Sequence, residues 1–346
     1  MDNFTLKVIG IVKDTPNVIS IRFKKPTFKK FHYKPGQYLT ISVKIDGRKY
    51  MRPYSISSSP NIDEEIEITI KRFDGGIVSN YLYNKTIIGD LIEVIGPIGD
   101  FYYDPSNHTD ETPIILWASG SGITPLFSIL KTALKFPPQK LVYLFYCSKN
   151  KEETIFYNEL NTLKQLYEQN FLIYYFYSKE ENTNNSPQIF GRISKDLILS
   201  ILPSLKDYQN SINYICGAIT LKEIIKNTLL ELGIKSDKIH SEDFELNINP
   251  IEFEGINNQV VEINKDNTTY KFEVSKGKSI LDAALDNLID LSYSCQTGNC
   301  KLCKAQLING EIKLIGIEKS SDDLSQNEYL LCCSYPLSDN VTLTIN

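Results

Sequence analysis

Five of the seven cysteines lie within 39 residues of one another near the C-terminus: Cys295, Cys300, Cys303, Cys332 and Cys333. The chain begins Met1-Asp2-Asn3, without the basic and apolar regions of an export signal, so we expect a cytoplasmic protein. An odd number of cysteines in a reducing compartment argues against a disulfide framework. A segment this rich in cysteine is instead expected to fold around a metal centre or to keep free thiols.

The spacing Cys295-x4-Cys300-x2-Cys303, followed much later by another cysteine, is the plant-type [2Fe–2S] pattern. Two bridged irons need four thiolates, and Gly298 allows the loop to fold back around them. Structural zinc usually takes paired C-x2-C units, of which only one is present. None of the three histidines lies among these cysteines, which excludes a Rieske centre. The pattern therefore predicts a [2Fe–2S] cluster, with zinc or free thiols as the alternatives.

The fourth ligand is either Cys332 or Cys333. They stand 28 and 29 residues beyond Cys303, counting the residues between. Neighbours on an extended chain face opposite ways, so only one of the two is expected to bind iron.

The N-terminal part, residues 1–106, predicts an antiparallel β-barrel. At roughly 100–200 residues per domain, 346 residues predict two or three domains. Short alternating strands are separated here by glycine- and proline-containing turns, as in small barrels. The expected strands are Thr5–Val12, Val18–Phe23, Tyr38–Val43, Ile66–Arg72 and Leu91–Ile95.

Residues 107–246 change to continuous apolar strands that alternate with amphipathic helices, which predicts a parallel α/β sheet. Residues 247–258 lack periodicity and are interpreted as a linker. Residues 259–346 then form a third, α+β domain around the cysteine loop. The expected strand and helix pairs of the second domain are Ile114–Ala118 with Pro125–Leu134, Leu141–Tyr146 with Thr154–Tyr167, Phe171–Tyr177 with Ser194–Ile201, and Ile212–Cys216 with Leu221–Leu232.

The first strand of the α/β pattern is followed by Gly120-Ser121-Gly122-Ile123-Thr124-Pro125 and a helix. Such a turn suits a pyrophosphate at a helix N-terminus, although a plain strand-to-helix turn has the same composition. Ser148 and Lys149 end the next strand, where the 2′-phosphate of NADPH would lie. The alternative is that this segment is a solvated loop. Ser148 and Lys149 are thus the only reason for which the sequence favours NADPH over NADH.

Two turns of the barrel predict a second dinucleotide, a flavin. Arg52 would pair with a diphosphate, Tyr54 would stack on a flat ring and Ser55 would hydrogen-bond a ring nitrogen. The run from Gly75 to Ser79 opens another helix, a further anion site. Taken alone, each of these segments is more often a plain turn or a capped helix than a ligand site.

The net charge of −5 argues against nucleic acid as a partner, and no apolar run reaches the length of a membrane span. Residues 259–346 carry 12 acidic and 8 basic residues. This domain could therefore steer a basic protein acceptor, with a solvated acidic surface as the alternative.

In these segments the chain resembles the ferredoxin–NADP reductase superfamily with a fused C-terminal plant-type ferredoxin domain. The likeness is greatest to oxygenase reductases of the phenylacetyl-CoA epoxidase type, and it runs along nearly the whole chain. The matching segments are 33–39, Arg52–Ser55, 71–81, 96–101, Gly120–Pro125, Cys216-Gly217, 240–244 and the cysteine loop.

The resemblance implies residue roles. It implies FAD contacts by Arg52, Tyr54, Ser55, Ile70, Lys71, Gly76, Val78 and Ser79, and nucleotide contacts by Gly120, Thr124, Ser148, Lys149, Cys216 and Gly217. Ser55 would stabilise the surroundings of flavin N5, Cys216 would lie beside the nicotinamide, and Glu242 and Phe244 would lie near the flavin. The resemblance also implies a proline four residues after the last cluster ligand; Pro336 fits this for Cys332, which is therefore the predicted fourth ligand, although the usual 29-residue spacing favours Cys333.

The expected fold is thus a flavin barrel, an α/β nucleotide domain and a β-grasp-like ferredoxin domain. The expected activity is electron transfer from NADPH through FAD and a [2Fe–2S] cluster to a partner oxygenase. A desaturase or another acceptor, a dihydroorotate dehydrogenase-type subunit, and a redox sensor without turnover are the alternatives.

Overall fold

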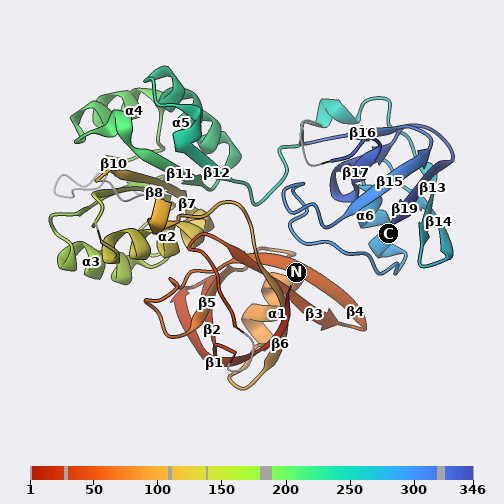
Figure 1. Ribbon diagram of the computed structural model, residues 1–346, viewed down its shortest axis with the longest axis horizontal. Helices are drawn as coiled ribbons and strands as arrows, with labels where there is room; N and C mark the ends of the chain where they lie inside the picture. The colour runs from red at the N-terminus through yellow and green to blue at the C-terminus, as the bar shows by residue number, and fades with distance from the viewer. Residues whose placement is uncertain are drawn as a thin grey trace. The chain divides into compact units, whose positions relative to one another are not determined.

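The computed structural model describes residues 2–26, 30–107, 111–137, 139–179, 189–317 and 324–345. The chain divides into two compact units, one of residues 1–43 with 53–243 and the other of residues 44–52 with 244–346. Figure 1 labels their helices and strands. None of the helices that the structure describes is long and apolar enough to cross a membrane.

The N-terminal domain is a six-stranded antiparallel sheet in the order β4-β3-β6-β1-β2-β5. An antiparallel bridge from Ile56, just after β4, to Ile68 of β5 joins the two ends of this order, so the predicted antiparallel barrel is confirmed. In β1 the buried residues Phe4, Leu6 and Val8 alternate with exposed ones, the pattern of a half-buried strand. The elements are β1 (Asn3–Thr15), β2 (Val18–Phe23), β3 (Tyr38–Ile45), β4 (Arg48–Ser55), β5 (Ile66–Lys71), α1 (Ile77–Lys85) and β6 (Leu91–Ile98).

A row of hydrogen bonds crosses the barrel wall from Asp14 on β1. The Ser20 hydroxyl on β2 donates to Asp14 Oδ2 over 2.6 Å and lies 2.8 Å from the Thr69 hydroxyl on β5. Thr69 in turn lies 2.9 Å from the Ser57 hydroxyl. Burial raises the pKa of the Asp14 carboxyl from 3.8 to about 6, with a smaller opposing effect of the Ser20 hydrogen bond.

Replacing Asp14 by asparagine is expected to stabilise the protein above pH 6 by ~3 kcal/mol, the size implied by a pKa shift of this order. A carboxyl whose pKa is raised on folding destabilises the folded state when it is ionised. This destabilisation by Asp14 is present above pH 6 and absent below its unfolded-state pKa of 3.8. The advantage of Asp14→Asn should therefore disappear as the pH falls below about 4. Denaturant unfolding at pH 8 and pH 4 measures it. Asp46→Asn, on an exposed turn, is the control, and an equal gain at both pH values would contradict the assignment.

The second domain is a six-stranded, all-parallel sheet in the order β10-β9-β8-β7-β11-β12. This confirms the predicted parallel α/β architecture. Its elements are β7 (Ile114–Ser119), α2 (Ile123–Lys135), β8 (Val142–Ser148), α3 (Tyr157–Leu166), β9 (Phe171–Tyr177), β10 (Ile189–Phe190), α4 (Lys195–Ile201), β11 (Ile212–Cys216), α5 (Ile219–Glu231) and β12 (Ile239–Glu242).

Both faces of this sheet are buried. Alternate residues of β7, such as Leu116, join one core with α2 and α3, while its other residues, such as Trp117, join a second core with α4 and α5. Figure 1 shows these helix pairs on opposite sides of the sheet. Burial on both faces explains why these strands are continuous apolar runs in the sequence.

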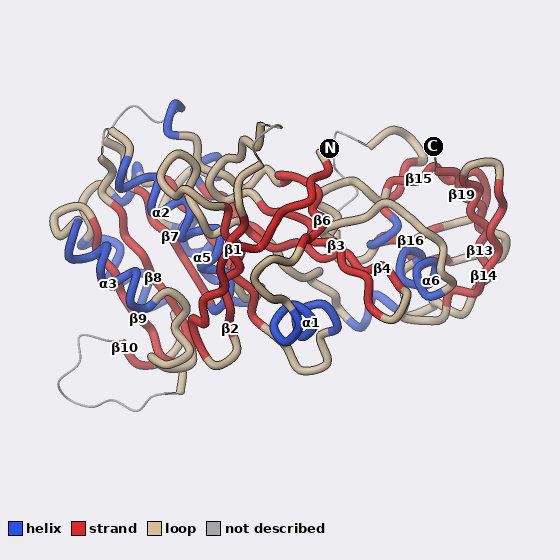
Figure 2. Tube along the Cα trace, turned by 90° about the horizontal axis from the view of Figure 1, so that it is seen from below, coloured by secondary structure: helices blue, strands red, loops and turns tan. Residues whose placement is uncertain are grey.

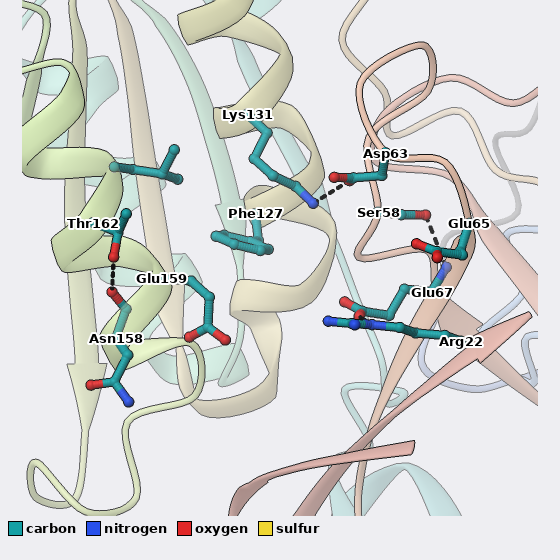
Figure 3. A pocket seen from close by; sticks show the side chains of 11 residues that line it. Arg22, Ser58, Asp63, Glu65, Glu67, Phe127, Lys131, Asn158, Glu159 and Thr162 are labelled. Carbon is teal, nitrogen blue, oxygen red and sulfur yellow. Dashed lines mark hydrogen bonds and ion pairs between the residues drawn. The ribbon is translucent and has the colours of Figure 1, made fainter. Parts of the chain in front are cut away.

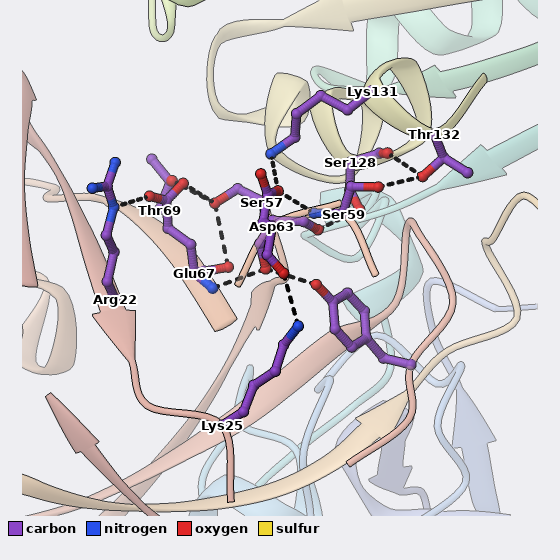
Figure 4. Close-up of polar contacts among 12 residues, drawn as sticks. Arg22, Lys25, Ser57, Ser59, Asp63, Glu67, Thr69, Ser128, Lys131 and Thr132 are labelled. Carbon is purple, nitrogen blue, oxygen red and sulfur yellow. Dashed lines mark hydrogen bonds and ion pairs between the residues drawn. The ribbon is translucent and has the colours of Figure 1, made fainter. Parts of the chain in front are cut away.

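Helix α2 is also bonded to the barrel turn that follows β4 (Figure 4). The Ser128 hydroxyl donates to the carbonyl of Ser58 over 2.6 Å, and the hydroxyls of Ser59 and Thr132 lie 2.6 Å apart. Lys131 forms an ion pair with Asp63. Because Ser128 and Thr132 are buried, these contacts fix the start of the nucleotide domain to the barrel.

The ferredoxin-like domain has a mixed sheet in the order β14-β13-β19-β15-β17, with β13 parallel to β19 and antiparallel to β14. Asp266 and Asn267 both have positive φ, as a two-residue hairpin turn requires. Helix α6 begins where the Ser279 hydroxyl accepts from the Asp282 N–H, and it packs on β14 (Figure 2). The elements are β13 (Gln259–Lys265), β14 (Thr268–Val274), α6 (Ile280–Asp286), β15 (Lys304–Asn309), β16 (Ile312–Leu314), β17 (Glu328–Leu330), β18 (Ser334–Pro336) and β19 (Val341–Ile345).

The stretch interpreted as a linker, residues 247–258, contains a short 3-10 helix at Pro250–Phe253. Asn249 caps it, with Glu252 completing a capping box. Ile256 packs in a small core with Ile315 and Tyr335, so the end of this stretch is attached to the ferredoxin-like domain.

Candidate functional site

The sheet of the nucleotide domain changes direction between β7 and β11. The chain runs from β7 outward through β8 and β9, whereas β11 lies on the other side of β7. The loops that leave the carboxyl ends of β7 and β11 therefore diverge, and α/β sheets bind ligands at such a switch point. Gly120–Gly122 follows β7, and Gly217 follows β11.

These two loops approach each other backbone to backbone. A Cβ on Gly122 would lie 2.2 Å from the carbonyl oxygen of Cys216, and a Cβ on Gly217 would lie 2.6 Å from the Ser119 Cβ. Any side chain at Gly122 would push the loops apart. The glycines of the predicted phosphate loop are thus needed for packing at the switch point.

Two hydroxyls hold the Gly120–Gly122 loop in place. The buried Tyr146 of β8 donates to the Gly120 carbonyl over 3.1 Å and accepts from the Ile155 N–H. The Thr124 hydroxyl donates to the Ser121 carbonyl over 2.9 Å. The role of Tyr146 was not evident from the sequence, because tyrosine in an apolar strand is typical of a core residue.

Cys216 ends β11, in register with Ala118 of β7 and Glu242 of β12. Its thiol is buried, and burial raises its pKa well above the ordinary value, with the Glu242 carboxylate adding to the shift. The thiol is therefore neutral. Two of the three predicted catalytic side chains, Cys216 and Glu242, end neighbouring strands next to Gly217.

Ser148 and Lys149 are both engaged within their own loop. The Ser148 hydroxyl donates to the Asn150 carbonyl over 3.0 Å and lies 2.7 Å from the Thr154 hydroxyl. Lys149 is exposed and forms an ion pair with Glu153 at 3.1 Å. NADPH over NADH stays a prediction, and Glu153 places a negative charge where a 2′-phosphate was expected.

Lys71 lies beside the phosphate loop. Its Nζ is 3.9 Å from the position that a Cβ on Gly120 would take. Burial lowers its pKa, and the charges of Glu153 and Lys149 act on it as well. The family resemblance implied a flavin contact for Lys71, and the structure brings this cation to the loop after β7.

The other predicted flavin residues lie at the ends of β4 and β5 and at the start of α1. Ile70 and Ser55 are buried. Gly76 precedes α1, where a Cβ would lie 2.5 Å from the Ser79 hydroxyl, and buried Val78 and Ser79 form the first turn. Free N–H groups of a first helical turn favour an anion. The partly exposed Tyr54 is on β4, and Arg52, which belongs to the second unit, donates to the Met51 carbonyl over 2.8 Å.

A pocket of about 480 Å³ opens between the barrel and helices α2 and α3 (Figure 3). Its lining includes Arg22, Asp63, Glu67, Lys131 and Glu159. Arg22 pairs with Glu67 at 2.8 Å, and Lys131 pairs with Asp63. None of the predicted cofactor residues lines this pocket, so it is a feature separate from the cofactor sites.

Four of the five cysteine thiols of the second unit form two pairs, and the fifth, that of Cys333, lies against Cys332. Cys295 and Cys300 are hydrogen-bonded to each other, as are Cys303 and Cys332. Within the part of the chain that the structure describes, no three His, Cys, Asp or Glu side chains converge as around a single metal ion. Two pairs of thiols match the need of two bridged irons, each with two cysteine ligands.

Backbone N–H groups point at the sulfur of Cys295. Those of Thr297 and Cys300 lie 3.4 and 3.3 Å from it. The hydrogen bond from the Cys300 thiol and these N–H groups lower the pKa of Cys295 to about 5 despite burial. A loop that favours a thiolate and points N–H groups at it fits an iron–sulfur cluster.

The two candidate fourth ligands are not on an extended strand. Leu331–Cys333 form a 3-10 helix, and the sulfurs of Cys332 and Cys333 lie 3.4 Å apart, both buried. The expectation that these two neighbouring side chains face opposite ways is therefore wrong, because it holds only for an extended chain. Cys332 is the one hydrogen-bonded to Cys303.

Phe244 is the last of the predicted flavin residues. It is the first residue of the second unit after 243, and its side chain is exposed.

Comparison with known proteins agrees with these three modules. Residues 5–103 match the oxidoreductase FAD-binding domain, residues 116–227 the oxidoreductase NAD-binding domain, and residues 263–337 the 2Fe-2S iron-sulfur cluster binding domain. The chain is 28% identical to one subunit of the 1,2-phenylacetyl-CoA epoxidase of Escherichia coli, over 98% of this chain and 96% of that protein. It is 27% identical to the ferredoxin reductase component of 3-ketosteroid-9-alpha-monooxygenase of Rhodococcus rhodochrous, over 98% and 95%.

Among solved structures, phthalate dioxygenase reductase is similar in fold, with a TM-score of 0.70 and 22% identity over 99% of this chain and 98% of that one. The chain is thus an NAD(P)H oxidoreductase with FAD and [2Fe–2S] modules. The three modules and their order bear out the resemblance to the ferredoxin–NADP reductase superfamily with a fused C-terminal plant-type ferredoxin domain.

Proposed function

We propose that this protein is the reductase component of an oxygenase system, taking electron pairs from a pyridine nucleotide and delivering them singly to a partner oxygenase. The observation that carries the proposal is the presence, in one chain, of a nucleotide loop at a switch point and two pairs of cysteine thiols on a ferredoxin-like domain. When bound, FAD accepts a hydride and the cluster accepts one electron at a time.

The proposed cluster ligands are Cys295, Cys300, Cys303 and Cys332. The pairing of Cys295 with Cys300 and of Cys303 with Cys332 supports this set, and Pro336 stands where the family has a proline. Backbone N–H groups of Thr297 and Cys300 would hold the Cys295 thiolate.

The proposed cofactor contacts remain those of the family pattern. For FAD they are Arg52, Tyr54, Ser55, Ile70, Gly76, Val78, Ser79 and Phe244, with Lys71 between FAD and the nucleotide. For the nucleotide they are Gly120, Thr124, Ser148, Lys149, Cys216 and Gly217. The proposed domains are residues 1–106, 107–246 and 259–346, joined by residues 247–258.

Three residues would act on the reacting rings: Ser55, Cys216 and Glu242. Ser55 would donate a hydrogen bond at flavin N5, and the neutral Cys216 would fill space beside the nicotinamide without adding charge. Glu242, at the end of β12 and in register with Cys216, would lie near the flavin. Holding donor and acceptor atoms in line is the contribution that a protein makes to hydride transfer.

The proposed partner is an oxygenase because relatives that align along nearly the whole chain are named as parts of an epoxidase and of a monooxygenase. The excess of acidic residues in 259–346 would favour an acceptor with a basic docking face. A cytoplasmic location is proposed as well, supported by seven cysteines that are all free thiols.

The test is aerobic turnover of the purified protein, after chemical assay of FAD and iron, with cytochrome c as a one-electron acceptor. We expect NADPH or NADH to drive cytochrome c reduction, and comparison of the two fixes the nucleotide. A protein that binds both groups but does not oxidise either nucleotide would instead be a redox sensor, and the proposal would be wrong.

A further inference from the structure

A fifth thiol lies against the two thiol pairs of the ferredoxin-like domain. Cys333 is fully buried, and its sulfur is 3.4 Å from that of Cys332. It also lies 3.3 Å from the position that a Cβ on Gly298 would take, so it abuts the loop between Cys295 and Cys300. The Ile315 N–H donates to the Cys333 carbonyl over 3.0 Å, which fixes this residue's backbone.

The 3-10 conformation of Leu331–Cys333 is what brings the two sulfurs to the same side. On an extended strand they would point to opposite faces. Cys332 is hydrogen-bonded to Cys303, which completes the second pair, whereas Cys333 is left over. This spare thiol has no place in a four-thiolate cluster, yet it is packed where it touches a ligand sulfur.

The direction of the sulfur–sulfur hydrogen bond follows from the proposed ligand set, on which this inference rests. A cysteine bound to iron is a thiolate, which can only accept a hydrogen bond. If Cys332 is the ligand, Cys333 carries the S–H and donates it. Hydrogen bonds to the cluster sulfurs are one of the means by which a protein sets the reduction potential.

We propose that Cys333 is a positioning residue for electron transfer, whose thiol donates a hydrogen bond to the sulfur of Cys332 and raises the reduction potential of the cluster. A donor at a ligand sulfur withdraws negative charge from it and so favours the reduced, more negative state. The consequence is a cluster that takes electrons more readily from the flavin.

The test compares Cys333→Ala with Cys333→Ser in the full-length protein carrying both FAD and the cluster. Alanine removes the donor, and serine replaces the S–H by an O–H. The reduced cluster is followed by electron paramagnetic resonance during a redox titration. We expect alanine to lower the ratio of reduced to oxidised cluster at a fixed potential by about tenfold, which is about 59 mV for one electron. Serine should stay close to the wild type.

Cys147→Ala is the matched control, because it removes a partly buried thiol from β8 of the nucleotide domain. It should leave the cluster potential unchanged. If Cys333→Ala does not fold, Cys333→Val replaces it as the variant without a donor, and serine remains the reference.

Two outcomes overturn the inference. One is an unchanged potential in a Cys333→Ala protein that holds its cluster. The other is loss of the cluster in Cys333→Ala but not in Cys332→Ala, which would make Cys333 the ligand. A wild-type protein without any cluster is a different result, since it would contradict the proposed function itself.

Discussion

Replacing Cys300 by serine is expected to remove the iron–sulfur cluster while leaving reduction of bound FAD by the pyridine nucleotide intact. The Cys300 thiol is hydrogen-bonded to Cys295, and the Cys300 N–H lies 3.3 Å from the Cys295 sulfur, so this pair is the proposed binding site of one iron. We expect cytochrome c reduction to fall more than about 100-fold, the upper end of the loss seen when partners of metal ligands are mutated.

Ferricyanide, which takes electrons directly from a reduced flavin, should still be reduced at nearly the wild-type rate by the Cys300→Ser protein. Visible absorption and iron content report the cluster independently of activity. Cys147→Ser, a thiol change in the nucleotide domain, is the control and should keep both. Retention of a full complement of iron by Cys300→Ser would contradict the ligand assignment.

Replacing Gly122 by alanine is expected to impair nucleotide use severely. Gly122 has φ −63° and ψ −9°, a conformation open to any residue, so backbone strain is not the cause. The cause is space, because the new Cβ would lie 2.2 Å from the Cys216 carbonyl oxygen. Moving this loop by about 1 Å is expected to lower kcat/KM for the nucleotide about 100-fold, as small misplacements do.

The measurement is ferricyanide reduction as a function of NADPH and NADH concentration, with circular dichroism to verify folding. Gly10→Ala is the matched control, since a Cβ there would make only an ordinary contact of 3.5 Å with Arg22. A Gly122→Ala protein with wild-type kcat/KM would show that the approach of the β7 and β11 loops does not shape the nucleotide site.

In the parallel sheet the sequence predicted β7, β8, β9 and β11 and missed the short outer strands β10 and β12. Phe171–Tyr177 and Ile212–Cys216 are strands with the predicted bounds, because strands buried on both faces are continuous apolar runs. Strand β4 (Arg48–Ser55) was not predicted, since it contains two arginines, a lysine and a proline and is mostly not buried. Helix α2 begins at Ile123, two residues before the predicted Pro125, because proline is tolerated throughout a first turn.

The candidate site was predictable where it depends on local spacing, as in the cysteine loop and the glycines after β7. It was not predictable where it depends on contacts distant in sequence. Lys71 reaches the Gly120 loop from another domain, and Tyr146 supports that loop from the neighbouring strand. The contact between Cys332 and Cys333 depends on a 3-10 turn, which no periodicity in the sequence reveals.

Electron transfer from nucleotide through flavin to cluster is tested most directly by mixing the purified holoprotein with NADPH or NADH without oxygen and following both redox groups in time. Stopped-flow absorption follows the flavin, and electron paramagnetic resonance of samples frozen at successive times follows the cluster. We expect the flavin to bleach first and the signal of a reduced [2Fe–2S] cluster to appear afterwards, with Cys300→Ser giving only the first event. A flavin that is reduced while an intact cluster stays oxidised would contradict this expectation.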